Sequence, residues 1–152
     1  MRKVLKVFLD ANVFFAAARS PKGGSGFVLE IAKKGELEIV TVSQALLEAE
    51  RNIFKKLGTR YLNCHYQNLL EIRPKIQSIG FITLEEIAKF KKLLPQKDIP
   101  ILFGAIVSKA QVLITLDKKH FLGNEKLRKM KFPCEIMNPG DFLGKYFRLG
   151  KK

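Results

Sequence analysis

The chain has 152 residues, of which 47% are hydrophobic, and these values are typical of one globular domain. No apolar run approaches the roughly 20 residues of a membrane span, and the N-terminal MRKVLKVFLD is charged too early for a signal peptide. The 28 lysines and arginines outnumber the 14 acidic residues, which gives a net charge of +14. We therefore expect a single cytoplasmic domain over residues 1–152, without membrane attachment.

The positive charge has two interpretations, and charge alone does not separate them. A basic protein attracts polyanions such as RNA, but a lysine-rich surface also serves general solubility. The two cysteines, Cys64 and Cys134, lack the spacing of a metal site, so we expect reduced thiols.

Strands and helices alternate along the chain. The predicted elements are, in order, a strand at 4–9, a helix at 12–18, a flexible loop at 20–26, a helix at 27–34, a strand at 37–42, a helix at 44–57, a helix at 60–72, an extended piece at 76–82, a helix at 83–93, a helix at 99–110, a strand at 112–116, a strand at 134–137 and a helix capped by Asp141. In the helix at 44–57 we expect five side chains to point inward: Leu46, Leu47, Ile53, Phe54 and Leu57. The alternation indicates an α/β fold with a mainly parallel sheet.

The stretch DIPILFGAIVSKAQVLITLDKKH, residues 98–120, has an aspartate near each end. Asp98 stands where a helix N-cap is expected, and Pro100 suits the first helical turn. Residues 112–116 form an apolar strand, and Asp117 follows it directly. In a right-handed βαβ unit the start of the helix and the end of the next strand meet at one sheet edge.

Four carboxylates are predicted to converge at this edge. Asp10 ends the first strand as Asp117 ends a later one, Asp98 begins a helix, and Glu48 lies in the first half of a helix after a strand. Taken singly, each acid is a common cap, loop or surface residue. Together they would repel one another, and Mg²⁺ or Mn²⁺ would neutralise them. Without these four charges the chain carries +18, which suits a metal-dependent nuclease.

Four segments together resemble the PIN-domain family. They are LDANVF at 9–14, VTVSQALLEAERNI at 40–53, DIPILFGAI at 98–106 and VLITLDKKHF at 112–121. The resemblance implies a Rossmann-like three-layer α/β/α sandwich, a Mg²⁺ or Mn²⁺ site and hydrolysis of single-stranded RNA. It also implies that the metal-binding and catalytic acids are Asp10, Glu48, Asp98 and Asp117, with Asn12 and Thr115 beside them.

Several assignments within this resemblance stay open. Glu50 competes with Glu48, because the two lie about 200° apart on a helix and only one can face the site. Leu116 stands where the family often has a small residue. His120 could act as a general base, although a lone histidine beside lysines is more often solvated. The expected substrate contacts are Asn12, Asn52, Thr115, Lys118 and Lys119, with Arg19, Lys22, Arg51 and Lys97 as weaker candidates.

The favoured function is a metal-dependent endoribonuclease, as the toxin of a toxin–antitoxin pair with a small antitoxin protein as partner. A homodimer is also compatible with the sequence. The alternative is an inactive RNA-binding PIN-like domain that acts through a partner complex, but the presence of all four acids argues against it. Phosphotransfer through an aspartyl intermediate ranks last, because that chemistry wants an aspartate where Asn12 stands.

Overall fold

Five parallel strands form one sheet in the order β3-β2-β1-β4-β5. The computed structural model describes residues 4–130 and 132–148, so both ends of the predicted domain lie outside the described residues. The strands are β1 (Leu5–Leu9), β2 (Leu37–Thr41), β3 (Lys75–Ile76), β4 (Val112–Ile114) and β5 (Glu135–Met137). The prediction of an α/β fold with a parallel central sheet is confirmed.

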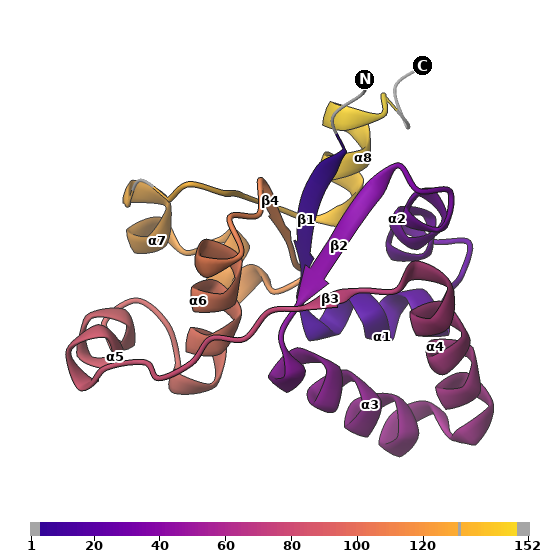
Figure 1. Ribbon diagram of the computed structural model, residues 1–152, viewed down its shortest axis with the longest axis horizontal. Coiled ribbons are helices and arrows are strands. Elements are labelled where there is room, and N and C mark those ends of the chain that lie inside the picture. The colour runs from indigo at the N-terminus through magenta and orange to yellow at the C-terminus, as the bar shows by residue number, and fades with distance from the viewer. Residues whose placement is uncertain (1–3, 131, 149–152) are drawn as a thin grey trace.

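Helices connect the strands and cover the sheet. They are α1 (Ala11–Arg19), α2 (Gly24–Lys33), α3 (Ser43–Leu57), α4 (Thr59–Ile72), α5 (Leu84–Lys91), α6 (Ile99–Val107), α7 (Glu125–Lys129) and α8 (Pro139–Tyr146). Figure 1 shows α6 on one side of the sheet and α1 and α2 on the other, which is the expected three-layer arrangement. No helix in the described part of the chain is long and apolar enough to cross a membrane.

Helix α6 lies unusually close to the sheet because Gly104 faces it. A Cβ atom at Gly104 would lie 2.5 Å from Val42 Cγ1 and 3.1 Å from Phe8 Cε2. The missing side chain therefore sets the depth of α6 against β1 and the end of β2. The same packing fixes the position of Asp98, which immediately precedes α6.

The structure corrects two of the predicted helix starts. Residues 20–26 are not a flexible loop throughout, because α2 already begins at Gly24, and the Gly23 carbonyl accepts a bond from Phe27 N–H. Helix α8 is capped by Asn138, whose side chain accepts the N–H of Asp141; Asp141 itself lies inside the helix.

The inward face predicted for α3 is also partly wrong. Leu47 and Phe54 are 56% and 59% exposed, whereas the buried residues are Ala45, Ala49 and Ile53. The small side chains allow α3 to approach α1 closely. The close contact with α1 is therefore made by these small residues and not by the larger apolar ones.

Candidate active site

The candidate site lies where the direction of strand order changes, between β1 and β4. Leu9 pairs with Ile114, and Asp10 N–H donates to the Ile114 carbonyl at 3.1 Å. Asp10 and Asp117 therefore follow neighbouring parallel strands at one sheet edge, as predicted. In open α/β sheets this switch point is where ligands bind.

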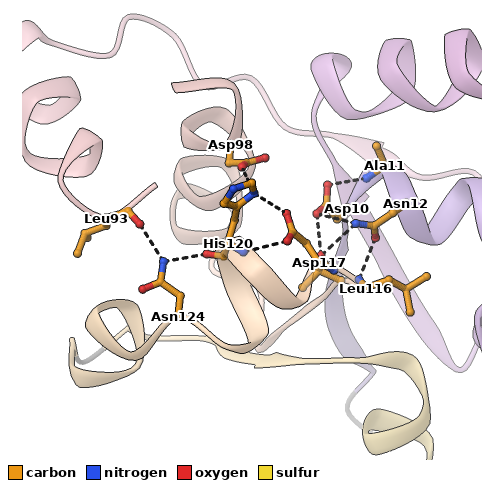
Figure 2. A network of polar contacts seen from close by, with 10 residues as sticks. Asp10, Ala11, Asn12, Leu93, Asp98, Leu116, Asp117, His120 and Asn124 are labelled. Atoms are coloured by element: carbon orange, nitrogen blue, oxygen red, sulfur yellow. Dashed lines mark hydrogen bonds and ion pairs between the residues drawn. The ribbon is translucent and has the colours of Figure 1, made fainter. Parts of the chain in front are cut away.

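Asp10 is held in place by donors on three sides (Figure 2). Its Oδ1 accepts the N–H of Ala11 at 2.7 Å, and its Oδ2 accepts the hydroxyl of Thr115 at 2.8 Å. The Asn12 amide lies 3.4 Å from the same Oδ2, and its carbonyl accepts Leu116 N–H at 3.0 Å. Asn12 thus ties the end of β4 to the start of α1.

Thr115 links two of the acids. It is fully buried, and its Oγ1 both donates to Asp10 and accepts the N–H of Asp117 at 3.1 Å. Because its hydroxyl is enclosed by these groups, Thr115 orients the carboxylates and has no surface for direct contact with a substrate.

A tighter cluster is formed by Asp98, Asp117 and His120. Each offers one ligand atom, and these atoms all lie within 4.8 Å of one another. His120 Nδ1 is 3.1 Å from Asp117 Oδ2 and 3.3 Å from Asp98 Oδ2 (Figure 2). The expectation of a merely solvated His120 is therefore wrong. Asp10 and Glu48 lie outside this group of three.

The π-helical turn Lys118–Leu122 explains how His120 reaches the acids. Asp117 caps this turn by accepting His120 N–H at 2.9 Å, so the residue three positions later faces back toward it. Asn124 supports the turn by donating to the carbonyls of Leu93 and His120 at 2.8 and 2.9 Å. The Asp-x-x-His spacing was the available sequence signal, since residues i and i+3 share a helical face.

Asp98 has a buried carboxylate oxygen without a hydrogen bond. The residue is 8% exposed, it precedes α6 as predicted, but its side chain does not cap the helix. Its Oδ2 makes no hydrogen bond within the described residues, and its contact with His120 is an ion-pair distance only. A buried acceptor left open in this way calls for a ligand.

Burial and like charges disturb the titration of two acids. Burial raises the pKa of Asp10 to about 6, aided by the charges of Asp98 and Glu48 and opposed by the bonds from Thr115 and Ala11. Burial likewise raises the pKa of Asp98, with Lys97 opposing and Asp117 adding to the effect. In both residues the cost of burying the carboxylate outweighs the groups that favour its charged form.

Of the two candidate glutamates on α3, Glu48 rather than Glu50 lies on the side of the helix toward the site. Its charge contributes to the raised pKa of both Asp10 and Asp98, so it lies within electrostatic reach of both. Glu50 instead accepts a hydrogen bond from Tyr66 on α4. Glu48 itself is exposed, and its side chain makes no hydrogen bond among the described residues.

The other expected substrate residues surround the cluster without joining it. Lys118 and Lys119 are exposed beside Asp117, and Asn52 is half-buried on α3 with no polar contact to the acids among the described residues. The donor set itself fits a divalent cation, because Mg²⁺ and Mn²⁺ take carboxylate oxygens and the unpartnered Oδ2 of Asp98 supplies an open one.

Comparisons with known proteins agree with this architecture. No protein-family model and no curated protein matches the sequence. A chain of VapBC2 from Rickettsia felis, solved bound to a DNA fragment from its promoter, is 18% identical with a TM-score of 0.64, covering 88% of this chain and 98% of that one. VapC20 from Mycobacterium tuberculosis, described as a Sarcin-Ricin loop cleaving toxin, is 11% identical with a TM-score of 0.58, covering 77% of this chain and 94% of that one.

These likenesses establish the class of fold. The chain has the PIN-domain fold, as the sequence resemblance implied. The particular proteins that share it include VapC toxins.

Proposed function

We propose that this chain is a single PIN-like nuclease domain, a metal-dependent endoribonuclease that hydrolyses phosphodiester bonds of single-stranded RNA. One observation carries the proposal: the unpartnered, buried Oδ2 of Asp98 lies within a compact group with Asp117 and His120. The net charge of +14 on the chain, or +18 without the four acids of the site, supports a polyanionic substrate.

In this proposal Asp10, Asp98, Asp117 and Glu48 hold Mg²⁺ or Mn²⁺. When bound, such an ion activates water and stabilises the leaving oxygen of the phosphodiester. Thr115 and Asn12 keep the Asp10 carboxylate aimed at the site through their bonds to its Oδ2. In the tautomer with a proton on Nδ1, His120 donates to Asp117 and orients that carboxylate. Lys118 and Lys119 contact phosphates of the RNA, and Asn52 lies beside the path of the RNA strand.

We further propose that the protein is the toxin of a toxin–antitoxin pair in the cytoplasm. VapBC2 of Rickettsia felis was solved with promoter DNA, and VapC20 is described as a toxin. The partner would be a small antitoxin protein. A homodimer of this chain is compatible with binding such a partner.

The proposal is tested with purified protein and a mixed-sequence single-stranded RNA, in Mn²⁺ or in EDTA. Asp117→Asn should abolish cleavage, whereas Glu38→Gln should leave it unchanged, because Glu38 is an exposed carboxylate at the opposite end of the parallel strands. RNA binding without cleavage in Mn²⁺ would favour the inactive RNA-binding domain. Cleavage that persists in EDTA would contradict the metal site.

A further inference from the structure

A pocket of about 510 Å³ lies directly beside the candidate active site. Leu116 and Lys118, which flank Asp117, form one wall, and Ala16 and Arg19 of α1 form another. Ala16 is six residues along α1 from Asp10, about 9 Å at the rise of an α-helix. One extended RNA strand can therefore occupy the candidate site and this pocket together.

The N-termini of α2 and α8 meet at the far wall of the pocket. A Cβ atom at Gly24 would lie 3.4 Å from Pro139 Cβ and 3.9 Å from Gly140 N. The first N–H groups of a helix have no partner within it. In α8, Pro139 has no N–H, and the Asn138 side chain accepts the N–H of Asp141. The N–H of Gly140 is therefore the one in this first turn that is open to a ligand. Two helix starts thus offer N–H groups and positive dipole ends to the same pocket.

Ser25 gives an independent sign that the pocket takes a ligand. Its residue is 5% exposed, it lines the pocket, and its hydroxyl makes no hydrogen bond to any residue that the structure describes. Its oxygen is not among the fully enclosed polar atoms that lack a partner, so the hydroxyl stays accessible from the pocket that Ser25 lines. The vacant hydrogen-bonding capacity of Ser25 faces the same volume as the two helix starts.

The charges of the lining also favour an anion. Arg19 and Lys118 are exposed lining residues, and the lining includes no carboxylate. The Arg19 guanidinium lies over the Phe15 ring at 5.9 Å, a contact that leaves its N–H groups available. Leu116, 41% exposed, and Leu122 add an apolar wall on which a base can pack.

From the convergence of two helix N-termini, the unpartnered Ser25 hydroxyl and Arg19, we propose that this pocket binds the phosphodiester group next to the one that is cut, with its base against Leu116. The proposal rests on the proposed function and assigns the path of the RNA along α1. Free phosphate has the same anionic chemistry, so the test must separate it from the RNA backbone.

Amide chemical shifts identify the ligand without any variant. Wild-type protein in EDTA is titrated with inorganic phosphate and, separately, with a short single-stranded RNA. The RNA should shift the amides of Gly24, Ser25 and Gly140 at concentrations at least tenfold below those needed with phosphate. Shifts with phosphate at equal or lower concentration would make this a free-anion site, and no shifts with RNA would overturn the proposal.

Fluorescence anisotropy of the same RNA, also in EDTA, then isolates the contribution of the pocket. Arg19→Gln and Ser25→Ala should each weaken binding by about fivefold to tenfold. Arg60→Gln removes the same charge from an exposed position on α4 and should change binding less than twofold. Equal losses of RNA affinity for Arg19→Gln and Arg60→Gln would show only general electrostatic attraction and would overturn the proposed role of the pocket. Because no metal is present, this failure is distinct from an absence of RNA cleavage, which would instead reject the proposed function.

Discussion

The Thr115 hydroxyl donates to Asp10 Oδ2 at 2.8 Å. This bond connects Thr115, which follows β4, with Asp10, which immediately precedes α1. Thr115→Val keeps the shape of a fully buried side chain but removes that donor. Because supporting bonds of this kind typically change metal affinity by 10–100-fold, we expect Mn²⁺ binding to weaken by about that factor. Isothermal titration with Mn²⁺ measures it. Thr115→Ser should bind as the wild type does, and equal weakening in both variants would contradict the role of the hydroxyl.

The raised pKa of Asp10 predicts how stability depends on pH in the absence of metal. Its folded-state pKa of about 6 lies above the ordinary value of 3.8, so its stabilising contribution is present at low pH and lost as pH rises through 6. This change corresponds to about 3 kcal/mol at 1.36 kcal/mol for each pKa unit. In EDTA, the wild type should therefore lose stability relative to Asp10→Asn by about this amount from pH 4 to pH 8.

Urea unfolding of the two proteins across this pH range gives the comparison. The difference between them cancels the titration of other groups. Added Mn²⁺ should restore the stability of the wild type at pH 8 and leave Asp10→Asn almost unchanged. If the difference in unfolding free energy between the two proteins stays constant with pH, Asp10 does not have the raised pKa of a buried, uncompensated carboxylate.

His65 on α4 should make the protein sensitive to acid. The side chain is 1% exposed, neither ring nitrogen has a hydrogen-bond partner among the described residues, and burial lowers its pKa despite the charge of Glu50. A lowered folded-state pKa gives stability that is present above the ordinary value of 6.5 and lost as pH falls.

His65→Phe should remove this loss, because Phe can keep the edge-on contact with Phe14, where the ring centroids are 5.9 Å apart. We expect the variant to exceed the wild type by about 1–3 kcal/mol near pH 5, since it also removes unsatisfied polar atoms. Thermal unfolding at pH 5 and pH 8 decides the matter. A variant that unfolds earlier at both values would show that His65 has a partner.

Gly104 should not tolerate a side chain. In Gly104→Ala the new Cβ would meet Val42 Cγ1 at 2.5 Å, so either α6 or Val42 must move. We expect a loss of about 1–3 kcal/mol, even though alanine favours the helix. Chemical unfolding measures the loss, and Val42→Ala in the same chain should recover part of it. Additive losses in the double variant would contradict this contact.

The parallel sheet and the meeting of Asp10 with Asp117 at one edge could be predicted from sequence, because both depend on the ends of apolar strands, whereas the strand order could not. The position of Asp98 followed from helix geometry in the same way. The burial of α3 could not, since Leu47 and Phe54 match a helical apolar face while Ala45 and Ala49 make the contact. Periodicity identifies an apolar face but not which neighbour approaches it most closely.

The part of His120 in the site could be predicted only in part. The Asp-x-x-His spacing suggests a contact with Asp117, but the π-helical turn that brings the ring to both acids is a backbone form that this spacing does not specify. The pocket beside the site depends similarly on α2 beginning within a segment that reads as a flexible glycine-rich loop. Both are tertiary outcomes, in which packing selects one of several local conformations.

The most direct test of the metal-dependent nuclease is the rate of RNA cleavage as a function of Mn²⁺ concentration, for the wild type and Asp10→Asn. We expect a rate that is zero in EDTA, that saturates at the Mn²⁺ concentration found by direct binding, and that Asp10→Asn lowers at least a hundredfold. Equal cleavage by both proteins, or cleavage independent of Mn²⁺, would contradict it.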